Sequence, residues 1–270
     1  QLEYSKLFKS NISLILNISP DHLERHKTIN KYVSAKFKLL KNQSIKDFAI
    51  LNTKNFYIKR ELESKNYLSK VIKVKKNIDS IFLKKINNQY FNTEGNKENL
   101  KFILEVTKLL KLKKNLVVKT LKKFKGLKYR QQIIFQAKKL TIINDSKATT
   151  FSSSASLLKS LTNVHWIVGG QGKKGDKLLL SKKNCKNFKA YVFGTNKNFF
   201  INKIKKLMIY ESFVDLKSLV KKLSSEIKID KNKTDKTILF SPSAASFDNF
   251  KNFEERGEYF NQLIKRYINV

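Results

Sequence analysis

The stretch INDSKATT, residues 143–150, decides the fold that we predict for the second half of the chain. It begins at the end of an apolar run, Leu140, Ile142 and Ile143, which is typical of a buried strand. It precedes a Ser-rich segment, 152–161, that reads as a helix. In an open α/β sheet, ligands bind beyond the carboxyl ends of the strands. The stretch is therefore predicted to be a strand-to-helix turn that forms part of a ligand site.

Beyond this turn, short apolar runs and longer amphipathic runs alternate to the end of the chain. Residues 131–145 are predicted to form a hairpin. The further elements that we expect are strands at 164–168, 190–194, 207–210 and 237–241, and helices near 176–184, 197–206, 215–227 and up to about 268. Such alternation indicates a Rossmann-like α/β domain, with a mostly parallel sheet and helices on its faces.

The first part of the chain is predicted to be α/β as well. Its pattern indicates strands at 13–19, 48–51 and 71–74, and the helical patterns after the first two suggest βα units. Residues 78–93 alternate more like antiparallel strands. A helix follows at 96–112, with one face made of Leu100, Ile103, Leu104, Thr107 and Leu110. We place the domain boundary near Gly126, which gives domains of 1–126 and 127–270.

The charge of the chain is extreme, at +36, and taken alone it would indicate nucleic acid or an anionic membrane as a partner. However, Lys supplies 52 of the 57 cations, whereas proteins that read phosphates and bases favour the planar fork of Arg. Basic stripes with interleaved aromatic residues do not stand out either. We therefore expect a solvated Lys-rich surface and no nucleic-acid partner.

The composition also predicts the compartment. The single Cys185 excludes an intrachain disulfide, which fits a reducing environment. No apolar run approaches the roughly 18 residues that span a bilayer, and the chain does not open on a signal-peptide pattern. We expect a cytoplasmic protein. Because QLEYSKLF lacks a Met and begins in the middle of what looks like an element, we also expect the chain to be a fragment.

Three polar clusters fall at the ends of predicted strands: NDSKAT (144–149), GGQGKKGD (169–176) and SPSAAS (241–246). Taken singly, the second could be a solvated glycine turn and the third a loop with a helix cap. Together on one rim they favour a site for anionic ligands, because exposed backbone amides bind anions and Lys147 and Lys173 add positive charge.

The rim gains two further candidates from the last cluster. Ser246 can cap a short turn. Asn252, with Glu255 three residues later, reads as a second helix start, which would leave the amide of Phe253 free to point at a carboxylate.

A further constellation, NISPDHLERH, lies at residues 17–26. Ser19 as N-cap and Pro20 at the first helical position place His22 in the opening turn. An unbroken helix would separate His22 from Lys36 by about 21 Å. Thr28 can cap a fresh helix, however, and a bend there could bring the two side chains together. Without further information, His22 could equally be a surface imidazole, and Lys36 is one of 52 Lys.

Several blocks of the sequence resemble the Mur ligases, the ATP-dependent amide-bond-forming enzymes of peptidoglycan precursor synthesis. The resemblance is greatest to the branch that adds D-glutamate. The blocks that carry it are QLE (1–3), NISPDHLERH (17–26), YVSAK (32–36), GNKEN (95–99), GLKYR (126–130), INDSKAT (143–149), GGQGKKGD (169–176) and SPSAASFDNFKNFEERG (241–257). They cover the whole chain in the order of the family.

The resemblance implies that the chain is the rear part of a central ATPase domain followed by a Rossmann-like C-terminal domain. The UDP-binding domain and the ATP phosphate loop would then precede Gln1, and the chain alone should be inactive. The family pattern also implies a magnesium site made by Glu3, His22 and Lys36, with Lys36 carbamylated so that it becomes an anionic oxygen ligand.

The resemblance assigns nucleotide contacts as well. Asn96 and Asn99 match positions that contact adenine. Arg130 and Asp145 match positions near the ribose and the phosphates. Lys147 would neutralise charge near the transferred phosphoryl group.

The remaining matched positions would hold D-glutamate: Thr149 and Lys173 at its side-chain carboxylate, and Ser246 with the Phe253 amide at its α-carboxylate. The implied reaction passes the γ-phosphoryl of ATP to UDP-N-acetylmuramoyl-L-alanine, and the amine of D-glutamate then attacks the acyl phosphate. The protein is expected to be a monomer. The chain departs from the usual family residues at Gly95, Thr150, Gln171 and Lys174.

Two alternatives stay open. Another Mur ligase, or a ligase like folylpolyglutamate synthetase, would share the ATP machinery but not the block at 241–257. A basic nucleic-acid-binding module would instead bind DNA or RNA with a steep dependence on salt.

Overall fold

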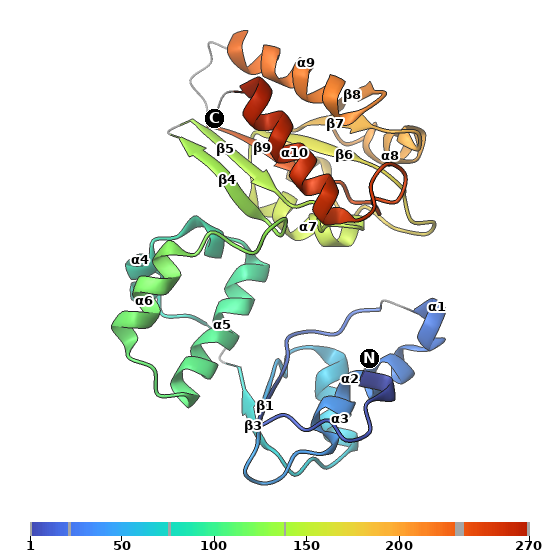
Figure 1. The fold of residues 1–270 in the computed structure, drawn as a ribbon. Coiled ribbons are helices and arrows are strands. Elements are labelled where there is room, and N and C mark those ends of the chain that lie inside the picture. The colour runs from blue at the N-terminus through green and yellow to red at the C-terminus, as the bar shows by residue number, and fades with distance from the viewer. Residues whose placement is uncertain (1, 21–22, 75–76, 138, 230–234, 269–270) are drawn as a thin grey trace. The chain divides into compact units, whose positions relative to one another are not determined.

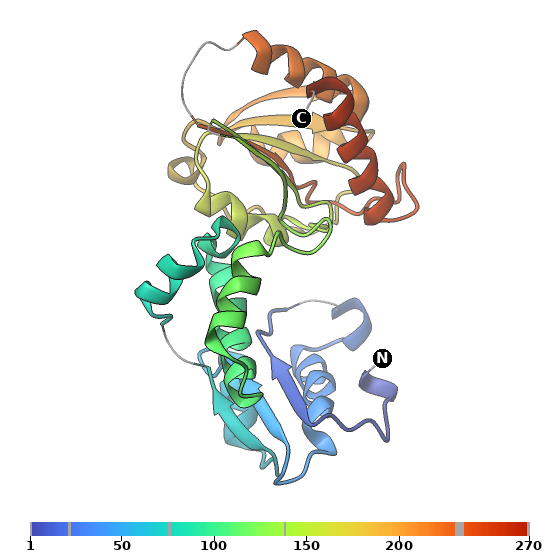
Figure 2. The same cartoon turned by 60° about the vertical axis from the view of Figure 1, so that its left-hand side comes forward.

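The computed structural model describes residues 2–20, 23–74, 77–137, 139–229 and 235–268. These residues divide into two compact units (Figures 1 and 2). Unit 1 comprises residues 1–91 and 96–123, and unit 2 comprises residues 92–95 and 124–270. Each unit has its own hydrophobic core.

Unit 1 is built on a parallel sheet of strand order β1-β2-β3, with β1 at Ile12–Ile15, β2 at Phe48–Leu51 and β3 at Lys70–Lys73. Helix α2 (Ile29–Lys41) follows β1 and helix α3 (Phe56–Ser64) follows β2, so the predicted βα units are confirmed. The core of the unit joins residues of both helices to the sheet, among them Val33, Phe37, Leu40, Ile58, Ile15 and Leu51.

The chain bends between α1 (Leu23–His26) and α2, as predicted. Lys27 adopts φ 64°, a left-handed conformation that ends a helix, and the side chain of Thr28 accepts a hydrogen bond from the amide of Lys31 as the N-cap of α2. The predicted placement of His22 in the opening turn falls outside the described residues.

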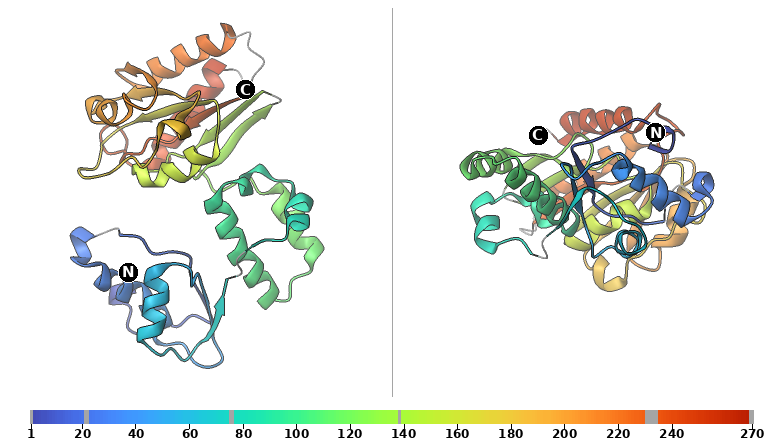
Figure 3. Two further views of the ribbon diagram at one scale, coloured as in Figure 1. Left: turned by 180° about the vertical axis from the view of Figure 1, so that it is seen from behind. Right: turned by 90° about the horizontal axis from the view of Figure 1, so that it is seen from below.

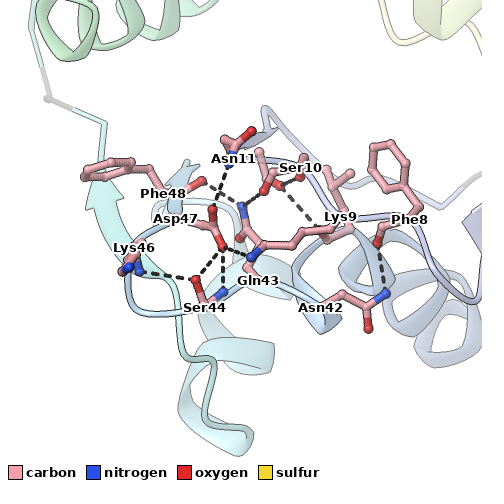
Figure 4. Close-up of polar contacts among 12 residues, drawn as sticks. Phe8, Lys9, Ser10, Asn11, Asn42, Gln43, Ser44, Lys46, Asp47 and Phe48 are labelled. Atoms are coloured by element: carbon pink, nitrogen blue, oxygen red, sulfur yellow. Dashed lines mark hydrogen bonds and ion pairs between the residues drawn. The ribbon is translucent and has the colours of Figure 1, made fainter.

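A polar network fastens the segment before β1 to the turn between α2 and β2 (Figure 4). The Gln43 amide donates to the carbonyls of Ser10 and Phe48, and the buried Asp47 carboxylate accepts from the amide and the hydroxyl of Ser44. The pKa of Asp47 lies well below its ordinary value, chiefly because of the hydrogen bond from the Ser44 amide. The network thereby holds the start of β1 beside the start of β2.

The predicted antiparallel strands at 78–93 are wrong. Residues Ser80–Ile86 form helix α4, whose N-cap Asp79 accepts from the amide of Ile81, and Gln89–Asn92 form a 3-10 helix. Helix α5 (Glu94–Leu109) is present as predicted, and α6 (Lys114–Lys123) was not expected. The predicted apolar face of α5 holds only in part, because Leu100 is buried whereas Leu110 is 53% exposed.

Unit 2 contains a mostly parallel sheet of strand order β4-β5-β9-β6-β7-β8, which confirms the predicted α/β class. The edge strand β4 (Gln132–Ala137) is antiparallel to β5 (Leu140–Asn144), as the predicted hairpin requires. The other strands run parallel: β6 at Val164–Gly169, β7 at Lys189–Phe193, β8 at Ile209–Phe213 and β9 at Lys236–Phe240. The last strand in sequence, β9, thus lies between β5 and β6.

Helices cover both faces of this sheet, which can be followed from behind in Figure 3. One face packs with α7 (Phe151–Ser160) and α8 (Lys197–Ile204) around Trp166. The other packs with α9 (Leu216–Ile229) and α10 (Phe253–Ile268). The predicted helix at 176–184 is wrong, because only Lys182–Cys185 form a 3-10 turn.

None of the helices within the described ranges is long and apolar enough to cross a membrane.

Candidate functional site

The strand order of unit 2 brings the predicted polar clusters together. The loops after β5 (145–150), β9 (241–250) and β6 (170–176) are here called the β5, β9 and β6 loops. Because β9 lies between β5 and β6, all three begin at one edge of the sheet. Backbone hydrogen bonds join them: Asp145 N to Phe240 O (2.7 Å), Gly169 N to Pro242 O (3.1 Å), Gln171 N to Ala245 O (3.0 Å) and Ala245 N to Gln171 O (3.1 Å).

Asp145 heads the β5 loop and is buried. Its Oδ1 accepts from the amide of Gln131 (3.0 Å), and its Oδ2 accepts from the hydroxyl of Ser241 (2.9 Å). Burial raises the pKa of Asp145 to about 7, against the opposing effects of these hydrogen bonds and of the exposed Arg130. A ligand hydroxyl near Asp145 would have to use lone pairs that these two donors leave free.

Lys147 and Thr149 follow on the same loop, and both are half-buried. The Lys147 ammonium lies 3.8 Å from the centre of the Phe253 ring at the start of α10, which is a cation–π contact. The loop ends where Thr150 caps α7, whose first amide, of Phe151, donates to Asp176 of the β6 loop (2.6 Å).

The glycines of the β6 loop allow close backbone approach. Gly170 has φ 121°, and a Cβ there would lie 2.8 Å from the carbonyl oxygen of Ala245. Any side chain would therefore push the β6 and β9 loops apart. Lys173 lies on the exposed part of this loop, in a turn closed by the Asp176 amide on its carbonyl (3.1 Å).

The β9 loop carries Ser246, which is 3% exposed and whose carbonyl accepts from the amide of Phe250 (2.9 Å). The predicted helix start at Asn252 is confirmed. Asn252 Oδ1 accepts from the Glu255 amide (2.8 Å), Glu255 accepts from the Lys251 amide (2.7 Å), and α10 begins at Phe253. The structure thus brings Asp145, Lys147, Thr149, Lys173, Ser246 and Phe253 onto one rim.

The rim also contains a residue that the sequence did not predict. Arg256 of α10 is fully buried, and its guanidinium donates to the β5 loop at Ser146 and to the β9 loop at Ala244 and Ala245. Its role has no local signature in the sequence, although Arg is rare in this chain, at five residues beside 52 Lys.

Of the other predicted site residues, Arg130 is exposed and lies in unit 2, just before β4. The rest belong to unit 1. Glu3 lies in the 3-10 helix Leu2–Tyr4, and its carboxylate pairs with Arg25 (3.1 Å). The Lys36 ammonium on α2 lies 5.1 Å from the centre of the Tyr32 ring. Asn96 on α5 is buried and donates to the carbonyl of Tyr90 (2.7 Å), and Asn99 is half-buried one turn later.

A hard cation such as Mg²⁺ needs several oxygen ligands. Side chains of His, Cys, Asp and Glu within the described ranges do not form a group that could hold a metal ion. His22 lies outside those ranges. Hydrogen bonding to Arg25 lowers the pKa of Glu3 and engages its Oε2. As an ammonium, Lys36 would repel a hard cation, so it could serve as a ligand only if it were carbamylated.

Comparison with known proteins agrees with this architecture. Residues 1–117 match the family model of the Mur ligase middle domain. The UDP-N-acetylmuramoylalanine–D-glutamate ligase of Rickettsia felis is 32% identical over 284 residues, which cover 99% of this chain and 63% of that protein. The chain belongs to the Mur ligase family.

Other Mur ligases extend the comparison. The enzymes of the same name from a Wolbachia of Brugia malayi and from Francisella philomiragia are each 32% identical, with 96% and 98% of the chain covered. The chain spans 54% and 62% of their lengths. Among solved structures, a UDP-N-acetylmuramate-alanine ligase from Thermotoga maritima matches with a TM-score of 0.62 at 14% identity, over 96% of this chain and 60% of that one. The MurF ligase of the same organism, in complex with ADP, also has a TM-score of 0.62, at 15% identity, over 97% of this chain and 63% of that one. These structures share the fold.

Proposed function

We propose that this Mur ligase chain is part of an ATP-dependent enzyme that joins D-glutamate to UDP-N-acetylmuramoyl-L-alanine in peptidoglycan precursor synthesis. The proposal rests chiefly on the strand order β5-β9-β6, because it gathers lysines, glycine turns and a helix start on one rim. Such a rim suits carboxylate and phosphate ligands. The names of the curated relatives support the same reaction.

In this proposal, residues 1–126 belong to the central ATP-binding domain and residues 127–270 form the domain that binds the amino acid. Asn96 and Asn99 contact the adenine. Arg130 and Asp145 contact the ribose and phosphates. The Asp145 carboxylate is already oriented by Gln131 and Ser241, so its free lone pairs point in fixed directions.

The amino acid occupies the other side of the same loops. Thr149 and Lys173 bind the side-chain carboxylate of D-glutamate, and Ser246 and the Phe253 amide bind its α-carboxylate. The first amides of a helix lack partners within the helix, so the start of α10 offers a donor to this group. The alternating residues of the β5 loop then face nucleotide and amino acid at once.

The chemistry follows from these positions. Transfer of the γ-phosphoryl group to the alanyl carboxylate gives an acyl phosphate and ADP. The amine of D-glutamate attacks the carbonyl carbon, and phosphate leaves as the amide forms. Lys147 supplies a fixed positive charge near the phosphoryl group throughout, which a loose transition state requires.

A magnesium ion would be held by Glu3, His22 and a carbamylated Lys36, and it would neutralise phosphate charge. The carbamate matters because an ammonium at Lys36 would repel the ion. We further propose that the protein is a cytoplasmic monomer that binds neither nucleic acid nor membrane.

The test is a coupled assay of ADP release by the full-length gene product. ADP should form only when both D-glutamate and UDP-N-acetylmuramoyl-L-alanine are present, with L-glutamate as the matched control. Lys173→Ala should raise the KM for D-glutamate, whereas Lys174→Ala on the adjacent exposed position should not. ADP release with only one substrate, or with a folate in place of the nucleotide sugar, would contradict the assignment.

A further inference from the structure

The guanidinium of Arg256 lies among loop oxygens at the centre of the rim. Its Nε donates to Ser146 Oγ (3.1 Å) and its Nη2 to Ser146 O (2.7 Å) and Ala244 O (2.9 Å). Its Nη1 donates to Ala245 O (3.2 Å). Gly170 lies against the same group, since a Cβ there would come within 3.1 Å of Nη1. The guanidinium therefore hydrogen-bonds the β5 and β9 loops and lies beside Gly170 of the β6 loop.

Burying such a charge is costly unless hydrogen bonds compensate for lost water. The acceptors that Arg256 reaches within the described chain are a hydroxyl and carbonyl oxygens, and Asp248 adds electrostatic support from the β9 loop. Burial lowers the pKa of Arg256 to about 10, so the group stays charged at neutral pH. Only the planar fork of Arg matches acceptors spread over two loops, because Lys offers a single point of donation.

These acceptors are the sequence neighbours of the proposed ligand contacts. Ser146 lies between Asp145 and Lys147, and its hydroxyl also donates to the carbonyl of Phe253 (2.8 Å). Ala245 precedes Ser246 and exchanges two hydrogen bonds with Gln171, two residues before Lys173.

We propose that Arg256 is the positioning residue that holds the β5, β6 and β9 loops in one register, so that the nucleotide contacts and the amino-acid contacts form a single rigid site. This assignment rests on the proposed ligase function. Arg256 itself touches neither ligand. It acts through Ser146, Ala244 and Ala245, and its loss releases the loops rather than unfolding the sheet, whose cores lie on the two faces.

The kinetic test uses the full-length gene product with Arg256→Lys, and with Arg266→Lys, an exposed Arg of the same helix, as the control. Arg256→Lys should raise the KM for D-glutamate and the KM for ATP together, each about tenfold, because charge-assisted hydrogen bonds are lost. Arg266→Lys should change neither value. Ser146→Ala removes one acceptor of Arg256 and should raise both KM values by a smaller factor. It replaces Arg256→Lys as the test variant if Arg256→Lys does not fold.

A second measurement is independent of activity. Amide hydrogen exchange should show faster exchange at 145–149, 170–175 and 244–246 in Arg256→Lys and unchanged exchange in α9. Normal exchange at the loops, or faster exchange throughout unit 2, would overturn the positioning role. If wild type fails the two-substrate assay but the loops respond as stated, the ligase assignment fails and the loop coupling stands.

Discussion

Asp145 shows how burial sets the state of a single carboxyl group. Two donors hold it, yet burial dominates and raises its pKa from 3.8 to about 7. Below pH 3.8 the group is protonated in both the folded and the unfolded chain. Above pH 7 it is ionised in both, and the folded state bears the cost of the buried charge. The free energy of unfolding therefore falls as pH rises from about 4 to 7.

We predict that Asp145→Asn removes this dependence, because the amide cannot ionise. Relative to wild type, the variant should gain about 4 kcal/mol between pH 4 and pH 8, at about 1.4 kcal/mol for each tenfold change in proton affinity. Thermal unfolding at several pH values measures the difference. Asp215→Asn is the control of opposite sign, because the Ser218 amide lowers the pKa of Asp215 and the variant should lose stability as pH rises. A constant gap between Asp145→Asn and wild type would refute the prediction.

A second prediction concerns Lys36. If its carbamate supplies an oxygen ligand, Lys36→Ala should lose activity in the full-length gene product, and added formate or acetate should restore part of it. Lys38→Ala, two residues on in the same helix, should need no such rescue. The measurement is the activity of each variant with and without about 50 mM carboxylate, a concentration suited to a weakly bound anion. Failure of every short carboxylate would count against the carbamate.

At the scale of elements, hydrophobic patterning predicted the strands of both sheets and most helices after them. It failed where runs were short. Phe82 and Ile86 are buried one helical turn apart, but over 78–93 a period of two fits the apolar residues nearly as well. The prediction of a helix at 176–184 failed in the opposite sense. Leu178 and Leu180 pack on the core while Leu179 is 64% exposed, which is the alternation of an extended chain.

The site residues likewise divide into those that the sequence predicts and those that it does not. Residues that end strands or cap helices could be found from the sequence, since turns and caps have local signatures. Arg256 could not, because its role depends on contacts with Ser146, 110 residues away, and with loops that only the strand order brings together.

Replacing either of two helical glycines by Ala should change the stability of the protein, and the two changes should have opposite signs. A Cβ at Gly257 in α10 would lie 2.4 Å from the Tyr129 ring, which Glu258 holds by a hydrogen bond of 2.9 Å. Gly257→Ala should therefore destabilise the protein by about 1–2 kcal/mol, since overpacking exceeds the gain in helix propensity. At Gly95 in α5 the nearest atom would be Ser156 Oγ at 3.6 Å, so Gly95→Ala should stabilise by up to about 1 kcal/mol. Chemical denaturation of both variants checks the signs.

At the scale of the whole molecule, the division into two units predicts two unfolding transitions. Unit 2 has a core on each face of its sheet, whereas unit 1 packs one core against a smaller sheet. Unit 1 should therefore unfold first in urea. The chain's one tryptophan, Trp166, is fully buried in unit 2 and reports that unit alone.

We expect the fluorescence midpoint of Trp166 to lie at higher urea than the first change in far-UV circular dichroism, which reports helices of both units. Coincident curves from the two probes would show that the units unfold as one.

The position of β9 has a consequence for how the protein is made. A ribosome delivers β5 and β6 long before β9, so the nascent sheet carries a gap at its centre through most of synthesis. Until Lys236–Phe240 emerge, the inner edges of β5 and β6 present unpaired backbone groups, which are templates for association between chains. A premature stop before Lys236 should thus yield an aggregating product rather than a smaller folded one, and chaperones should bind that intermediate during translation.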